Sequence, residues 1–272
     1  MAKVTQQNLA TTLSDMEKEL RAVSTPAQYG KVMRRNEGQP IRHTEYRQRV
    51  GTALYLNVIS RPDISNCVRE LAQHMDNPGD DQWKQLKHLI SYIRGTKDIG
   101  FVLRGDGKLQ INGYVDSDFA TDPNTRRSIT GYLVFIGNSL VSWKSKQQAC
   151  VTLSSTEAEY YAMSQCATEM TFIGNLLNDI GIKNVKKVMN CDNTGAIFLA
   201  KNMAVGQRTK HIDTRCHYLR ELVEKNELVI NYVNTKDNLA DLLTKNLGTG
   251  NFERLREVIV TGDLEALKEG GC

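Results

Sequence analysis

The sequence lacks three features that would each indicate a particular class of protein. Among its 272 residues no run of 18 or more apolar residues occurs, which excludes a transmembrane helix. The segment Met1–Asn8 lacks the apolar core of a signal peptide, so we expect an intracellular protein with no membrane partner. The six cysteines are scattered without any C-x-x-C pair, which argues against a zinc site and against a disulfide framework.

A strong net charge is also absent. The formal charge of +4 does not by itself indicate a nucleic-acid-binding protein, but clusters of two or three basic residues alternate along the chain with acidic motifs. Basic patches around an acidic pocket suit a phosphate backbone that passes over bound metal ions. Surface lysines are commonplace, so a solvated face explains any single cluster equally well. The clusters are Arg126/Arg127, Lys144/Lys146, Lys183/Lys186/Lys187 and Arg208/Lys210/Arg215.

Four acidic residues, each in its own short motif, carry the main functional signal. They are Asp116 in Gly113–Ala120, Glu159 in Leu153–Tyr160, Asp192 in Met189–Asn193 and Asp241 in Asn238–Lys245. Two are expected at strand ends and two in helices, so no local structure requires them. Carboxylates that converge in one pocket repel one another unless cations neutralise them, and hard oxygen ligands suit Mg²⁺ or Mn²⁺. The set therefore predicts a metal-dependent nuclease in which all four bind metal and act in catalysis.

The residue pattern divides the chain into successive parts. Residues 1–43 form a polar lead-in, and residues 44–98 form a small helical segment with three expected helices. Asp63 is expected to cap the second of these helices. Residues 99–246 alternate between strand and helix patterns, and residues 247–272 form a C-terminal helix and tail.

The alternating part predicts an α/β fold, with a mixed five-stranded sheet flanked by helices. Its strands are rich in Val, Ile, Tyr and Phe, and Gly137-Asn138 is a hairpin signal. Ligands of such sheets tend to lie at strand ends. The expected strands cover 109–117, 128–136, 140–144, 187–191 and 228–233, with a short strand over 101–103 before them. One expected helix begins at Thr156, and four others cover 193–202, 212–225, 238–246 and 251–260.

Several motifs occur together in one order along the chain. Those of the second half are Gly113–Ala120, Arg126–Tyr132, Val141–Gln148, Leu153–Tyr160, Arg208–Arg220 and Leu239–Lys245. With them, Tyr114 to Lys245 resembles the ribonuclease H domain of Ty1/copia-type retrotransposon Pol polyproteins. Upstream, Tyr46–Leu56, Ser60–Ile64 and Trp83–Thr96 resemble the segment that connects the polymerase to the ribonuclease H in that family. The chain is therefore similar to the C-terminal part of such a polyprotein.

The resemblance implies a ribonuclease H-like fold and an endonuclease that hydrolyses the RNA strand of RNA/DNA hybrids. Two Mg²⁺ ions would serve it, and Mn²⁺ can replace them. The implied partners are the hybrid and the remaining Pol domains, in the cytoplasm (within a virus-like particle) or the nucleus. No polymerase activity is expected, because nothing resembles a polymerase palm or fingers. The candidate nucleic-acid contacts are Ser117, Arg126, Arg127, Lys144, Lys146, Asn193, Arg208 and Lys210.

Some neighbouring residues leave alternatives open. Glu157 and Glu159 point about 200° apart on a helix, so only one can face the pocket. The resemblance favours Glu159, and Glu157 suits the first helical turn. Asp118 either adds to the metal site or follows the strand in a loop, and Asp122 is most simply part of a turn. His211 is a candidate catalytic residue, because the resemblance to ribonucleases H implies a mobile histidine near the site that can help product leave.

A surface position is the alternative for His211, and equally for His217, because both lie in a basic helical region.

Two other functions are compatible with the sequence. The chain can be a catalytically silent element remnant or a nucleic-acid-binding module retained by the host, although the intact carboxylates argue against loss of activity. The second alternative is an integrase or resolvase on a related fold. The acidic residues of those enzymes are arranged differently from the ones in this chain.

Overall fold

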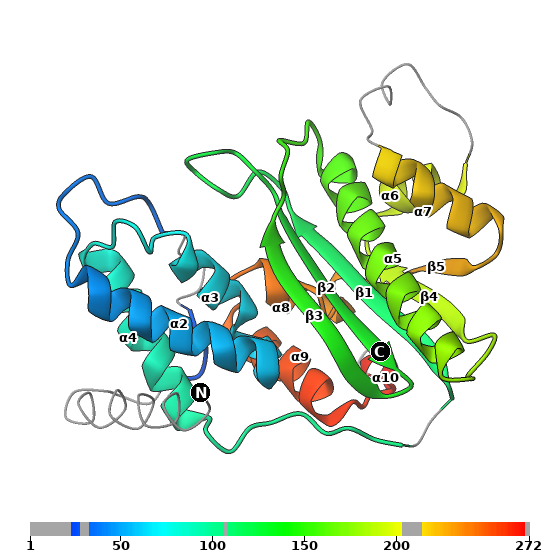
Figure 1. Ribbon diagram of the computed structural model, residues 1–272, viewed down its shortest axis with the longest axis horizontal. Coiled ribbons are helices and arrows are strands. Elements are labelled where there is room, and N and C mark those ends of the chain that lie inside the picture. Colours follow the sequence, from blue (N-terminus) through cyan, green and yellow to red (C-terminus); the bar gives the residue numbers. More distant parts are fainter. Residues whose placement is uncertain (1–22, 28–32, 106–107, 203–213, 270–272) are drawn as a thin grey trace. The chain divides into compact units, whose positions relative to one another are not determined.

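A computed structural model describes residues 23–27, 33–105, 108–202 and 214–269 (Figure 1). The chain divides into two compact units. Among the described residues, unit 1 ends at Phe101 and resumes over Lys245–Arg256, and unit 2 comprises Val102–Thr244 and the residues from Glu257 onward. No helix in these ranges is long and apolar enough to cross a membrane.

Unit 1 is helical. Its elements are α2 (His43–Ile59), η1 (Pro62–Ile64), α3 (Ser65–Ala72), α4 (Asp80–Gly95) and the first part of α9 (Thr249–Thr261). Apolar side chains one helical turn apart, such as Leu86, Leu89 and Ile93 on α4, are buried in its core. The three helices expected between residues 44 and 95 are therefore present.

The expected helix cap by Asp63 is wrong. Asp63 lies in η1, and α3 begins after Ile64 without a side-chain cap. The Asp63 carboxylate instead accepts hydrogen bonds from Arg61 Nε (2.9 Å) and Nη2 (2.8 Å), and from the Tyr92 hydroxyl (2.6 Å). Both charged side chains are buried, and a buried charge needs a partner more than a helix end needs a cap.

Unit 2 contains a mixed five-stranded sheet in the order β3-β2-β1-β4-β5. β1 (Gln110–Asp118), β2 (Ile129–Ile136) and β3 (Ser139–Gln147) form an antiparallel meander, whereas β4 (Lys186–Cys191) and β5 (Leu228–Tyr232) continue the sheet in parallel pairing. The remaining elements are α5 (Ser155–Asp179), α6 (Thr194–Lys201), α7 (Thr214–Glu224), η3 (Thr235–Asp237), α8 (Asp241–Thr244) and α10 (Ala266–Glu269). The predicted fold class is confirmed.

The long helix α5 packs on one face of this sheet (Figure 1). Gly113 on β1 permits the close approach, because a Cβ there would lie 2.7 Å from Met170 Sδ and 3.0 Å from Cys166 Sγ of the helix. Side chains alternate along a strand, so Asp116, three residues on, points to the opposite face. There α8 contacts β1 and β2.

Residues 101–103 do not form the expected strand. The Val102 amide donates to the carbonyl of Val260 (2.9 Å) near the end of α9, and the side chains of Val102 and Leu103 are exposed. Strand-like composition does not suffice where no neighbouring strand offers a ladder. The expected helix over 238–246 is also shorter, since only Asp241–Thr244 is α-helical. The turn at Asp122 is confirmed, because its Oδ1 accepts from the amides of Asn124 (2.7 Å) and Thr125 (3.0 Å).

Candidate metal centre

The four acidic residues approach one end of the sheet from four different elements. Asp116 is near the end of β1, and Asp192 follows β4 directly. Glu159 lies in the second turn of α5, and Asp241 is the first residue of α8. This placement brings acids together that are up to 125 residues apart in the sequence.

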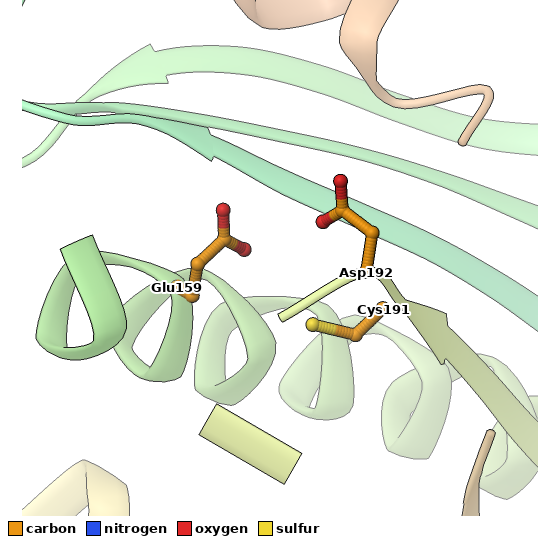
Figure 2. Close-up of side chains that lie close together, drawn as sticks. All are labelled: Glu159, Cys191 and Asp192. Carbon is orange, nitrogen blue, oxygen red and sulfur yellow. The ribbon is translucent and has the colours of Figure 1, made fainter. Parts of the chain in front are cut away.

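The acids form two groups that share one member. Asp116, Asp192 and Asp241 each offer a carboxylate oxygen within 4.8 Å of the other two. Glu159, Asp192 and the Cys191 thiol form a second group with the same spacing. Figure 2 shows the carboxylates of Glu159 and Asp192 on the same side of α5, with the Cys191 sulfur beneath them. Asp192 therefore links Glu159 to the two other aspartates.

The two neighbouring glutamates of α5 have different contacts. Glu159 is buried, and its Oε1 accepts a hydrogen bond from the Ser117 amide (3.0 Å) at the end of β1. Its Oε2 is buried without a hydrogen-bond partner in the part of the chain that the structure describes. Glu157 instead accepts from the Leu153 amide (2.8 Å), while its own amide donates to Ser154 Oγ (3.1 Å). Glu157 thus belongs to the N-terminal cap of the helix.

The electrostatic environment of Glu159 favours its protonated form. Burial, followed by the negative charges of Asp116 and Asp192, raises the pKa of Glu159 to about 9, although the Ser117 amide opposes the shift. Burial and the nearby Glu159 also raise the pKa of the Cys191 thiol. A positive charge among these buried carboxylates would offset the repulsion between them.

The donor set fits a hard divalent cation. Carboxylate oxygens are the ligands that Mg²⁺ and Mn²⁺ prefer. A cation beside Glu159 would neutralise the repulsion and would give its Oε2 a partner. Cys191 is a soft ligand and is excluded from this assignment, because Mg²⁺ does not favour thiolates.

Three further residues near the acids were not singled out from the sequence. Thr244, the last residue of α8, donates a hydrogen bond from Oγ1 to Asp116 Oδ2. Asn238 Nδ2 donates to the Val115 carbonyl (2.9 Å), which fixes the start of the same segment to β1. Gly131 on β2 lies beneath α8 and opposite Asp116. Their positions inside the motifs Arg126–Tyr132 and Asn238–Lys245 are the sequence signal that could have indicated them.

The candidate nucleic-acid contacts have varied surroundings. The Ser117 side chain is buried, and Asn193 Oδ1 caps α6 by accepting from the Ala196 amide (2.9 Å). Lys144 and Lys146 are exposed, two residues apart on the edge strand β3. Arg126 is exposed and Arg127 half-buried in the loop between β1 and β2.

Other candidates lie outside the two acidic groups or outside the described ranges. Asp118, the last residue of β1, is in neither group, and His217 is exposed on α7. Arg208, Lys210 and His211 lie outside the described residues.

The chain is similar in sequence to polyproteins of several transposons. No protein-family model matches it. It is 38% identical over 214 residues to the retrovirus-related Pol polyprotein from transposon TNT 1-94 of Nicotiana tabacum. The aligned region covers 79% of this chain and 16% of the relative. With the corresponding polyprotein from transposon RE2 of Arabidopsis thaliana it shares 40% identity over 217 residues, or 79% of the chain and 15% of the relative. The chain is homologous to a region of the Ty1/copia-type Pol polyproteins.

The homologous region is a small part of those polyproteins, since the chain spans about a sixth of their length. The Ty1-DR6 Gag-Pol polyprotein of Saccharomyces cerevisiae is 26% identical over 249 residues, which are 86% of this chain and 14% of the relative.

Two solved structures resemble parts of the chain. LC11-RNase H1, isolated from compost, matches with a TM-score of 0.39 and 15% identity over 50% of this chain and 94% of that one. The foamy viral protease-reverse transcriptase, solved with an RNA/DNA hybrid, matches with a TM-score of 0.47 and 12% identity over 74% of this chain and 26% of that one. The strand order and mixed pairing of unit 2 are ribonuclease H-like.

Proposed function

We propose that unit 2 is a metal-dependent nuclease that hydrolyses the RNA strand of RNA/DNA hybrids. The observation that carries the proposal is the convergence of Asp116, Glu159, Asp192 and Asp241 in two groups that share Asp192. Homology to Pol polyproteins supports a nucleic acid as the substrate. The motif resemblance to the ribonuclease H part of that family supports the hybrid.

The four carboxylates would hold the divalent cations, with Mg²⁺ as the expected ion and two ions as the expected number. When bound, such ions supply an activated water and stabilise the leaving oxygen of the scissile phosphate. The Ser117 amide holds Glu159 in place through Oε1, so that Oε2 is left for a ligand. The buried position of Asp116 and Glu159 strengthens every electrostatic interaction at the site.

The exposed basic residues would guide the nucleic-acid backbone to the acids. Lys144 and Lys146 on the edge strand, with Arg126 in the loop before β2, offer positive charge to phosphates. Preference for a hybrid requires contacts to 2′-hydroxyl groups across a wide minor groove. Asn193 would make such contacts through its amide nitrogen, because its oxygen already accepts from the Ala196 amide to cap α6.

The proposal extends to the rest of the chain by the same homology. Residues 44–98 would correspond to the segment that connects the polymerase to the ribonuclease H, with residues 99–246 as the nuclease domain and 247–272 as a C-terminal helix and tail. Further Pol domains would be partners of the chain. It would act in the cytoplasm, within a virus-like particle, or in the nucleus.

Cleavage of labelled substrates tests the proposal. The purified chain is incubated in Mg²⁺ with an RNA/DNA hybrid, single-stranded RNA, duplex RNA and duplex DNA of one sequence. We expect cleavage of the RNA strand of the hybrid alone, with 5′-phosphate and 3′-hydroxyl ends and complete loss in EDTA. Asp192→Asn should abolish it, whereas Asp179→Asn, an exposed residue at the far end of α5, should not.

Two results would contradict the nuclease. One is an intact hybrid in the presence of wild-type protein and Mg²⁺, and the other is an equal rate for Asp192→Asn and wild type. Binding of the hybrid without cleavage would instead identify a silent nucleic-acid-binding module.

A further inference from the structure

We propose that Thr244 is a positioning residue of the metal site, which it serves by fixing the carboxylate of Asp116. This inference rests on the proposed metal-dependent function. Thr244 ends the short helix that begins with Asp241. One helical turn therefore supplies one acid of the site and the hydroxyl that holds another.

The contact joins two buried side chains that are far apart in the sequence. Thr244 Oγ1 donates to Asp116 Oδ2, and the side chains are 2% and 1% exposed. The carbonyls of Asp241 (3.3 Å) and Ala240 (3.5 Å) are the other acceptors near this hydroxyl. A hydroxyl has one proton to donate, and a bond to a carboxylate is stronger than a bond to a neutral carbonyl. The proton is therefore directed to Asp116.

Asp116 needs such a restraint. The terminal torsion of an aspartate side chain is broad, so the backbone of β1 does not fix the direction of the oxygens. Repulsion from Asp192, whose carboxylate lies in the same group, would turn the Asp116 carboxylate away from that group. A donor on Oδ2 opposes this rotation and holds the carboxylate in place before a cation arrives.

The seat of α8 on the sheet fixes Thr244 independently of any cation. A Cβ at Gly131 would lie 2.6 Å from Thr244 Cγ2 and 2.9 Å from Leu243 Cβ, so the helix rests directly on the β2 backbone. Asn238, which is fully buried, anchors the preceding residues through the Val115 carbonyl. The hydroxyl can consequently be removed while most of the packing around it stays.

Two matched pairs of variants isolate the hydroxyl. Thr244→Val exchanges the hydroxyl for a methyl group of similar size, and is compared with wild type. Thr244→Ala and Thr244→Ser both lack the methyl group and differ from each other by the hydroxyl alone. If Val does not fold at this buried position, the Ala and Ser pair still gives the answer. Thermal melts of all four chains control for folding.

The direct readout is Mn²⁺ affinity of the full chain without nucleic acid, measured by electron paramagnetic resonance. We expect the dissociation constant to rise about tenfold in Thr244→Val relative to wild type and in Thr244→Ala relative to Thr244→Ser. In hybrid cleavage, the Mg²⁺ concentration for half-maximal rate should rise by a similar factor, with a near-wild-type rate at saturating Mg²⁺. A merely structural role would lower the rate at every Mg²⁺ concentration.

Equal Mn²⁺ affinity within both pairs would overturn the role of Thr244. If wild type then still binds Mn²⁺ and cleaves the hybrid, the proposed function stands without this residue. If wild type neither binds Mn²⁺ nor cleaves, the proposed function fails and the role of Thr244 fails with it.

Discussion

Asp116 on β1 lies directly opposite Gly131 on β2, and the missing side chain at position 131 lets α8 rest on the sheet beside the acidic groups. A Cβ there would also lie 3.0 Å from the Ala240 carbonyl, which is backbone and cannot rotate away. α8 carries both Asp241 and Thr244. Gly131 thus sets how closely α8, with Asp241 and Thr244, approaches Asp116 on β1.

Gly131→Ala should therefore destabilise the protein by about 1–3 kcal/mol, as overpacking of a tight contact does. Urea unfolding measures the change. The control is Gly51→Ala in α2, where a Cβ would meet nothing within 4 Å. This control should gain up to about 1 kcal/mol from helix propensity. A Gly131→Ala protein as stable as wild type would show that α8 is not seated on the glycine.

Glu159 should make the metal-free protein less stable as pH rises. Its pKa is raised to about 9 in the folded state, whereas an ordinary glutamate titrates at 4.5. Between these values the folded chain keeps a proton that the unfolded chain releases, so stability falls through this window. Glu159→Gln removes the effect. The stability of Glu159→Gln relative to wild type should therefore grow by at least about 1 kcal/mol from pH 5 to pH 8. The release of one proton can change the free energy of unfolding by at most about 1.4 kcal/mol per pH unit.

Urea unfolding in EDTA at the two pH values gives this difference. Glu157→Gln serves as the control, because Glu157 is only half-buried in the helix cap. The same stability gap between Glu159→Gln and wild type at both pH values would speak against a raised pKa.

Removing one partner of the buried pair of Arg61 and Asp63 should strongly destabilise unit 1. Asp63→Ala leaves the guanidinium of Arg61 buried without its carboxylate and removes the acceptor of the Tyr92 hydroxyl. We expect a loss of about 3–5 kcal/mol in urea unfolding. Lys84→Ala breaks an exposed pair with Asp81 at 3.8 Å and should cost less than about 1 kcal/mol. Similar costs for the two variants would be the contrary result.

Lys144 and Lys146 should contribute to hybrid affinity through phosphates rather than bases. Replacement of either by Ala should weaken binding to hybrids of any sequence, and should lower the slope of log affinity against log salt by about 1. Binding titrations at several salt concentrations measure both. Lys183→Ala is the control, because Lys183 is exposed before β4 begins, at the other end of that strand from Asp192. An unchanged slope for both β3 variants would remove these lysines from the interface.

The sequence predicted the five strands of the sheet, though not the absence of a strand at 101–103, and it predicted the convergence of the four acids. The signals for these features are local. A short motif surrounds each carboxylate, and hydrophobic runs mark β1, β2 and β4. The contacts of Asp63 and Thr244 could not be predicted in this way. Asp63 has a cap-like position, but its partner Tyr92 is 29 residues away, and Thr244 is 128 residues from Asp116. Asn193 had a local signal that was overlooked, since an asparagine directly before a helix is a common N-cap.

One matched pair of variants tests most directly whether the carboxylates act together as a metal-dependent nuclease. Glu159→Gln and Glu157→Gln make the same change two residues apart, one beside Asp192 and one in the helix cap. In a single-turnover assay on an RNA/DNA hybrid with Mg²⁺, we predict that Glu159→Gln loses at least about 100-fold in rate, because loss of a direct metal ligand should cost at least as much as loss of an outer-shell partner, which costs about 10–100-fold. Glu157→Gln should stay within about twofold of wild type. Equal rates for the two variants would contradict the proposed site.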